Sequence, residues 1–312
     1  MPFPNARDVH QDSVLTNLSV QYRNEEYIAA QCVPKVLVRK ASDKYYEFDQ
    51  GDWFRDEAGE RAAATTGPVG GYSLSTQSYD TKQYSMATYV ADEERDNADA
   101  GLDLDRQAIE YCADKVQLRF ETQAAGLLFK AGSYPTGHQK TLSGAAQWNN
   151  ASSKPIADIR AAKSQIGGAI GRQPNTLILG EQTYLQLQDH PDVLDRVKYT
   201  QSGAVTPDLL AGLFDVNRVL VGRAVQNAAA EGLDPSYKRV WGKHAALIYT
   251  APMPGLRTLS FAYWFVWRGY DFTAERWRKS DGGASDGFRV RAQWDSKIAA
   301  KTAGYFIENA VA

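Results

Sequence analysis

The chain has 312 residues, of which 43% are hydrophobic and 23% charged, a composition typical of a globular protein. Its 35 basic and 37 acidic residues give a formal charge of −2, which argues against a dedicated nucleic-acid-binding protein, because these usually carry a basic domain. The longest wholly apolar run, Phe261–Trp267, is far shorter than the roughly 20 residues that span a bilayer, so no membrane segment is predicted. Met1–Asp8 lacks the apolar core of a secretory signal, and two cysteines cannot make a disulfide framework.

The first 34 residues are polar and show little apolar patterning. Val14, Leu18 and Tyr22 are spaced four residues apart and share one face of a helix, so a short helix is predicted over residues 11–22. A helix of this length is not stable by itself in water, and it needs another surface to pack against.

Two β-favouring stretches flank a long polar connection. Strands are predicted over Val36–Phe48 and Tyr72–Val90, and in the second of these alternate residues fall on one face. Gly51–Gly71, between them, is rich in glycine and charge and has no periodicity. Because a structureless loop of about 20 residues is uncommon inside a compact domain, we expect a neighbouring subunit to order this one.

The strongest helical pattern covers Leu104–Phe129, where apolar residues such as Cys112 and Val116 recur at helical spacing. About 25 helical residues would extend about 38 Å, which indicates a spine for the domain. The acidic run Asp92–Asp105 does not have the spacing of a calcium-binding loop, and it is interpreted as a solvated segment at the positive end of the helix dipole. Lys130–Ser153 is a connector rich in glycine, serine and asparagine.

The second half of the chain alternates between helix and strand and then becomes β-rich. Alternation over residues 155–250 predicts a compact α/β unit. Its predicted helices are Ile156–Ile170, Gln182–Val197 and Pro207–Phe214, and its predicted strands are Thr176–Leu179, Arg218–Val221 and Val240–Thr250. Further strands are predicted over Thr258–Trp267, Asp271–Arg278, Phe288–Ala300 and Gly304–Ala312.

No motif for metal or cofactor binding is found. The histidines do not stand at i, i+4 and the cysteines are not in a C-x-x-C pair, so neither a metal site nor a cofactor is predicted. The four histidines are His10, His138, His190 and His244.

One short pattern could carry hydrolytic chemistry. Gly283–Gly287 fits G-x-S-x-G, but a nucleophile elbow needs a buried strand before the serine and a helix after it. Here a polar stretch precedes the serine and a strand follows, so the pattern is interpreted as the tip of a β-turn. A hydrolase that uses Ser285 as its nucleophile remains a less favoured alternative.

Five of the seven tryptophans lie in the second half of the chain, close to several arginines. Packing in a core or at an interface is favoured for them, and a carbohydrate-binding β-protein is a further alternative. They are Trp241, Trp264, Trp267, Trp277 and Trp294.

The order of these elements resembles that of the major capsid proteins of tailed bacteriophages, which have the Hong Kong 97-type fold. Proteins of that family consist, in chain order, of an N-terminal arm, an extended E-loop, a peripheral (P) domain with a spine helix, an axial (A) domain and a β-rich return to the P domain. Ala157–Lys163 followed by Pro174–Tyr184 is similar to the helix–strand–helix opening of the family's A domain. The resemblance covers nearly the whole chain and implies an α+β fold.

The resemblance also implies a division of the chain into five segments. These are the N-terminal arm (1–34), the E-loop (35–90), the P domain with spine helix and connector (91–154), the A domain (155–252) and the β-rich return to the P domain (253–312). In the E-loop, aromatic anchors and charged neighbours are expected to contact another subunit. These residues are Trp53, Phe54, Arg55, Asp56, Glu57, Glu60 and Arg61.

Two features of the family's type member are not expected here. That protein joins its subunits through a Lys–Asn isopeptide bond, but the matching turn, Lys279–Gly287, contains no asparagine. Lys44 and Lys82 therefore lack an obvious partner, and no cross-link is predicted. The type member also carries a long cleaved scaffolding segment, whereas only about 34 residues precede the E-loop here, which implies a separate scaffolding protein.

The function implied by the resemblance is structural and not enzymatic. Hexamers and pentamers of the chain would form the icosahedral head of a tailed phage around the genomic DNA, after assembly in the bacterial host cytoplasm. The expected partners are further copies of the chain, a portal, a scaffolding protein, a possible decoration protein, and double-stranded DNA in weak non-specific contact. An encapsulin-like nanocompartment shell, which encloses protein cargo, is the alternative with the same fold.

Overall fold

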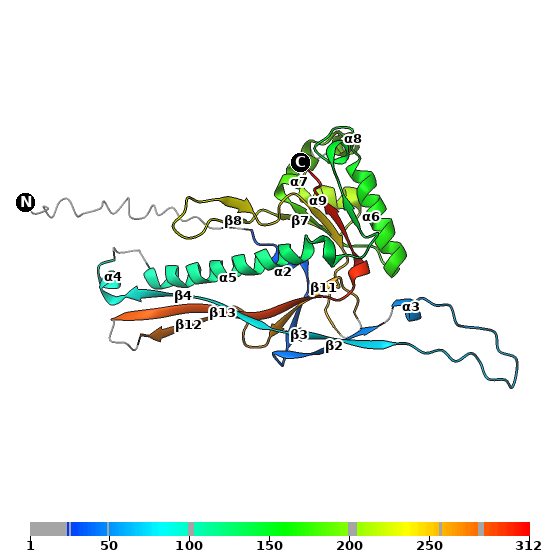
Figure 1. Cartoon of the computed structure of the whole chain (residues 1–312), viewed down its shortest axis with the longest axis horizontal. Coiled ribbons are helices and arrows are strands. Elements are labelled where there is room, and N and C mark those ends of the chain that lie inside the picture. The colour runs from blue at the N-terminus through cyan, green and yellow to red at the C-terminus, as the bar shows by residue number, and fades with distance from the viewer. Residues whose placement is uncertain are drawn as a thin grey trace, which may run out of the picture.

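The computed structural model describes residues 24, 26–48, 50–98, 103–198, 205–255, 258–279 and 284–312. The helix predicted over residues 11–22 lies outside these ranges. Figure 1 shows an elongated molecule, in which a long helix lies along a long sheet, a compact α/β body sits at one end, and a two-stranded loop projects beyond it.

The described elements combine helices and strands throughout the chain. The helices are α2 (Ala29–Cys32), α3 (Gln50–Trp53), α4 (Asp92–Asp96), α5 (Leu104–Leu128), α6 (Pro155–Ile170), α7 (Glu181–Asp189), α8 (Pro191–Val197) and α9 (Pro207–Phe214). The strands of the first half are β1 (Lys35–Val38), β2 (Ser42–Phe48), β3 (Leu74–Asp80), β4 (Lys82–Ala91) and β5 (Gln139–Thr141). Those of the second half are β6 (Thr176–Gly180), β7 (Arg218–Gly222), β8 (Val225–Asn227), β9 (Tyr237–Arg239), β10 (Ala245–Ile248), β11 (Ala262–Trp267), β12 (Thr273–Arg278), β13 (Ser285–Ile298) and β14 (Gly304–Glu308).

The long sheet is built around β13. It has the order β1-β11-β13-β12, and β4 pairs with β13 along its other side. Alternate residues of β13, including Phe288, Val290 and Trp294, are buried beneath α5, because successive side chains of a strand point to opposite faces. Phe120 of α5 meets the Trp294 ring edge-on with ring centroids 5.1 Å apart. The predicted spine helix is thus confirmed as α5, with one face on this sheet.

The short sheet forms the centre of the α/β body. Its order is β5-β14-β10-β6-β7, and β6 is buried at every position, as its apolar sequence predicts. Helices α6 to α9 gather around it (Figure 1). Helix α6 begins with Pro155, which suits the first turn, and ends at Gly171 with φ +64°, the left-handed conformation that favours glycine.

Several of the predicted elements differ from those observed, including the strand predicted over 72–90, which is β3 and β4. The helix predicted over 182–197 is two helices, because Pro191 disfavours helical conformation in the preceding His190 and starts α8 instead. The strand predicted over 240–250 is reduced to β10, since Gly242 has φ +53° and turns the chain. The strand predicted over 36–48 is β1 and β2, which belong to different sheets.

A fully buried carboxylate, Glu121, joins three parts of the molecule. Its Oε1 accepts hydrogen bonds from the backbone N–H of Ile28 (3.0 Å) and the indole N–H of Trp241 (2.5 Å), and its Oε2 accepts the N–H of Ala29 (2.8 Å). Ile28 and Ala29 begin α2, while Trp241 belongs to the α/β body. Burial raises the pKa of the Glu121 carboxyl, and the three donors act in the opposite direction. The Glu121 side chain therefore links α5 both to α2 and to the α/β body.

Replacing Glu121 with alanine is expected to lower the free energy of unfolding by about 3 kcal/mol or more, since three buried donors would lose their acceptor at roughly 1–3 kcal/mol each. Urea unfolding followed by tryptophan fluorescence would measure this change. The control is Glu110→Ala, because Glu110 pairs with the exposed Arg106 on the same helix and its loss should cost no more than about 0.5 kcal/mol. Equal effects of the two variants would contradict the role given to Glu121.

Candidate assembly surface

The projecting loop is a hairpin with a closed neck. Strands β2 and β3 are antiparallel, in register from Ser42 opposite Asp80 to Phe48 opposite Leu74, and they form a separate two-stranded sheet. Beyond them, Asp52 Oδ2 accepts hydrogen bonds from the backbone N–H (2.7 Å) and hydroxyl (2.6 Å) of Ser73. These bonds hold the pKa of the Asp52 carboxyl below its usual value. The two ends of the long polar connection are therefore joined by the hydrogen bonds between Asp52 and Ser73.

The residues expected at a subunit contact lie together at this end of the hairpin, on α3 and just after it. Trp53 and Phe54 are 60% and 63% exposed, although apolar side chains of this size are usually buried. Arg55 pairs with Glu57 at 3.1 Å. The remaining members of the expected set are all exposed: Asp56, Glu60 and Arg61.

Sequence analysis missed further apolar side chains of the same hairpin that are also exposed. They are Tyr46, Val69, Tyr72 and Leu74. Trp53 and Tyr72 face each other with ring centroids 6.0 Å apart. An aromatic residue on each side of the glycine-rich stretch is the signal in the sequence that points to such a pair.

The base of the loop also touches the α/β body of its own chain. Gln50 accepts a hydrogen bond from the Thr302 hydroxyl (3.0 Å) and donates one to the Ala169 carbonyl at the end of α6. A Cβ placed on Gly171 would lie 3.4 Å from the Phe54 ring. One aromatic of the expected set, Phe54, thus lies against its own subunit, and this contact could not be seen in the sequence.

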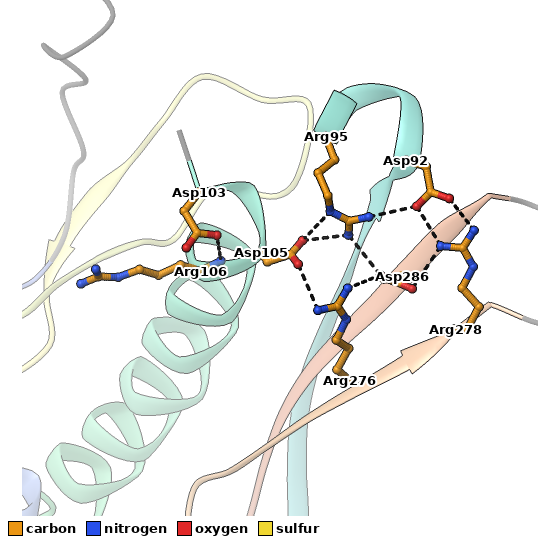
Figure 2. A network of polar contacts seen from close by, with 8 residues as sticks. All are labelled: Asp92, Arg95, Asp103, Asp105, Arg106, Arg276, Arg278 and Asp286. Atoms are coloured by element: carbon orange, nitrogen blue, oxygen red, sulfur yellow. Dashed lines mark hydrogen bonds and ion pairs between the residues drawn. The ribbon is translucent and has the colours of Figure 1, made fainter. Parts of the chain in front are cut away.

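A closed ring of six alternating charges lies at the far end of the long sheet (Figure 2). It comes from α4, the first turn of α5, and strands β12 and β13. In order around the ring its members are Asp92, Arg95, Asp105, Arg276, Asp286 and Arg278. Three arginines and three aspartates leave the ring with no net charge.

Asp286 is the hub of this charge ring. Its residue is only 7% exposed, and its carboxylate contacts Arg276 at 2.5 Å, Arg95 at 3.2 Å and Arg278 at 3.3 Å. The hydrogen bond from Arg276 is the main reason why the pKa of the Asp286 carboxyl lies below its usual value. Hydrogen bonds from Arg278 likewise lower the pKa of Asp92. The ring ties two strands and two helices into one tip.

Sequence analysis interpreted the acidic run Asp92–Asp105 as a solvated segment, and this is wrong for the aspartates that belong to the charge ring. Asp92 and Asp105 are bound by arginines that lie more than 170 residues later in the chain. Asp103 does act at the helix start as predicted, since its carboxylate accepts the backbone N–H of Arg106 at 3.0 Å.

Ser285 does not sit on a nucleophile elbow. It is the first residue of β13, opposite Ala91 of β4, with a strand and not a helix after it. A different serine, Ser153, lies 3.0 Å from His190 Nε2. His190 Nδ1 accepts the N–H of Asp192, so the ring proton is on Nε2 and this nitrogen cannot take a proton from Ser153. Neither serine is activated as a nucleophile.

The described residues contain no group of three or more side chains suited to hold a metal ion. Within the same ranges, no helix combines the length and the apolar character needed to cross a bilayer.

The charge ring should stabilise the protein in a pH-dependent way. Because the pKa of Asp286 is lower in the folded chain than its usual value of 3.8, its contribution is complete above that value and is lost as the pH falls through the folded pKa. Asp286→Asn is expected to lower the melting temperature at about pH 6, and the difference from the unmodified chain should shrink towards about pH 3. A difference that is constant over this range would show that the loss does not come from the charge.

Comparison with known proteins places this architecture in a family. Residues 94–229 match the family described as Phage major capsid protein E. The chain is 31% identical over 239 residues to the major capsid protein of Burkholderia phage BcepMu, covering 76% of each chain. It is 28% identical over 306 residues to that of Pseudomonas phage JBD67, covering 96% of this chain and 97% of the relative.

Solved structures agree over nearly the full length. A phage-related protein from Bordetella bronchiseptica superposes with a TM-score of 0.73 and 26% identity over 96% of this chain and 97% of the other. The capsid protein of cyanophage P-SCSP1u gives a TM-score of 0.64 at 9% identity, over 98% and 95% of the two chains, which shows a shared fold. The predicted α+β Hong Kong 97-type fold is therefore confirmed.

These relatives are phage shell proteins, so they decide between the functions that sequence analysis left open. The chain is a structural protein of the icosahedral head of a tailed phage and not an enzyme. Together with the fold, the identity to the BcepMu protein shows that this chain belongs to the family of phage major capsid proteins.

Proposed function

We propose that the hairpin formed by β2 and β3 is the segment through which each subunit of the head binds the next. The observation that carries this proposal is the exposure of Trp53 and Phe54 at its end. Buried aromatic anchors surrounded by charged residues are typical of stable protein interfaces. Arg55, Asp56, Glu57, Glu60 and Arg61 would supply the charged rim of this contact.

The shape of the subunit supports a head-to-tail contact. In Figure 1 the loop that carries α3 lies at one end of the molecule and the tip with α4 at the other. A contact between unlike surfaces at opposite ends repeats from copy to copy and closes into a ring when the rotation allows. Hexamers and pentamers are two such closures. The division into an arm (1–34), E-loop (35–90), P domain (91–154 and 253–312) and A domain (155–252) is part of the same proposal.

Further partners follow from the role in a head. A portal, a separate scaffolding protein and a possible decoration protein would meet the shell, and assembly would take place in the bacterial host cytoplasm. The head would enclose double-stranded DNA. The net charge of −2 supports only a weak and non-specific contact with the packaged phosphates, because tight binding requires many basic contacts.

Deleting Asp52–Thr66 is expected to leave a folded subunit that no longer forms shells. The strands β2 and β3 keep their pairing, and Tyr79 at their base still stacks on Phe265 with ring centroids 4.6 Å apart. Negative-stain electron microscopy would report shells, and circular dichroism would report folding. Loss of the folded α/β body in this variant would contradict the proposal.

Trp53→Ala should weaken assembly far more than it lowers the melting temperature of the isolated subunit, since the side chain is 60% exposed in one chain. Truncation of an interface anchor costs about 2 kcal/mol or more, which raises the critical concentration for assembly roughly 30-fold per contact. Met253→Ala is the matched control, because Met253 is also apolar and 82% exposed but belongs to the segment between β10 and β11 and not to the hairpin. Equal effects on assembly would reject a specific role for Trp53.

A further inference from the structure

The β8–β9 hairpin ends in a turn of defined shape. Asn227, the last residue of β8, accepts the backbone N–H groups of Ala229 (3.0 Å) and Ser236 (2.9 Å) with its side-chain oxygen. Ala228 donates its N–H to the Ser236 carbonyl at 2.8 Å, and Gly232 has φ +86°, a conformation that favours glycine. These hydrogen bonds hold the turn, residues 228–236, in one conformation.

The base of this hairpin is fixed to the rest of the subunit. The Asn24 side chain donates to the Val225 carbonyl and accepts the Val225 N–H, both at 3.0 Å. Gln226 of β8 accepts a hydrogen bond from Thr122 of α5 at 3.3 Å. Because a two-stranded hairpin alone is only marginally stable in water, these contacts are needed to set the direction of the turn. Figure 1 shows that it points away from the end with the β2–β3 hairpin.

The turn exposes an apolar side chain close to two acidic ones. Leu233 is 69% exposed, and Glu231 and Asp234 beside it are exposed as well. Residues 228–236 contain no lysine or arginine, so the turn carries a charge of −2. A leucine on a turn that is already ordered can bind a partner with little further loss of conformational entropy.

A pocket opens on the α/β body between α6 and the end of α9. Its volume is about 460 Å³, which is ample for a leucine side chain, since a cavity of about 150 Å³ holds benzene. Its apolar lining comes from Ile156, Ile159, Leu213 and Phe214. In Figure 1, α6 lies on the side of the α/β body that faces away from the β8–β9 turn.

The polar lining of this pocket has a positive charge. The Lys163 ammonium donates to the carbonyls of Phe214 (3.0 Å) and Asp215 (2.6 Å) at the end of α9, and it pairs with the Asp215 carboxylate at 2.6 Å. Arg160, about one turn earlier on α6, also lines the pocket, and it has no ion-pair partner among the residues that the structure describes. Two cations and one carboxylate give +1, opposite in sign to the charge of the turn.

We propose that the β8–β9 turn of one subunit enters the α6–α9 pocket of the next subunit in the ring. Leu233 then packs on the apolar lining, and Glu231 and Asp234 lie near Arg160. The complementary charges and the opposite directions of turn and pocket support a second copy as the occupant, because a contact between unlike surfaces repeats around a ring. The proposal rests on the head-to-tail arrangement proposed above, but not on the role of Trp53.

Cysteine cross-linking of assembled shells tests this contact. Leu233→Cys and Ser164→Cys, which is in the pocket wall, are combined in one chain, whose natural Cys32 and Cys112 are buried and should not react. Oxidation with copper–phenanthroline should join subunits into a ladder of multimers on non-reducing gels, because each subunit carries one cysteine of each kind. The matched control pairs Ser164→Cys with Met253→Cys, at an exposed position between β10 and β11, and should give no ladder.

A charge exchange tests the same contact without new cysteines. Arg160→Glu should raise the critical concentration for assembly about tenfold or more, since like charges would then meet at the pocket. Adding Glu231→Lys and Asp234→Lys to the same chain should restore assembly, because every contact again joins opposite charges. Light scattering would measure assembly, and circular dichroism would confirm that each variant is folded.

Three outcomes would overturn the proposal: shells of the cysteine variant that give no ladder, a ladder that stops at dimers, or Arg160→Glu without a loss of assembly that the added lysines restore. The β2–β3 hairpin is unmodified in all of these variants. A failure here therefore leaves the proposed role of Trp53 standing, and normal assembly of Trp53→Ala would likewise leave the ladder intact.

Discussion

The three hydrogen bonds to Glu121 are the constraint on which the subunit depends. A carboxylate with no access to water is tolerated only when hydrogen-bond donors replace the water it has lost, and here all of them come from outside its own helix. If α2 or Trp241 moved away from α5, the Glu121 carboxylate would remain in an apolar interior without its hydrogen-bond donors. The long sheet with its helix and the α/β body are therefore held in one arrangement at this point, and the entering chain is fixed with them.

The parts of the fold that sequence analysis predicted correctly are those with strong local patterns. The spine helix α5, the buried strand β6 and the helix α6, with Pro155 at its start and Gly171 at its end, are each specified by neighbouring residues. Sequence analysis missed the interruptions of helices and strands that depend on a single residue. His190 precedes a proline, and Thr81 separates β3 from β4 because its N–H and hydroxyl both bind the carbonyl of Ala41.

Long-range polar contacts were beyond sequence analysis because nothing local distinguishes them. Glu121 is one of many charged residues on a helix, and no periodicity marks it as buried. The aspartates of the charge ring looked like an ordinary acidic segment before a helix, since the arginines that bind them come from the other half of the chain. The surface residues of the β2–β3 hairpin were easier to find, because tryptophan and phenylalanine in a stretch without periodicity have no core of their own.

Strand β13 links the two ends of the subunit mechanically. Asp286, near its start, is the hub of the charge ring, and Asp295, near its end, accepts the N–H of Asp80 at the root of the projecting hairpin with a distance of 2.9 Å. The nine residue-to-residue steps from Asp286 to Asp295 extend about 30 Å. A force that acts on the hairpin would therefore be transmitted along β13 as shear, and the hydrogen bonds on both edges of this strand would share it. In a shell under internal pressure, β13 would be the element of each subunit that bears the tension.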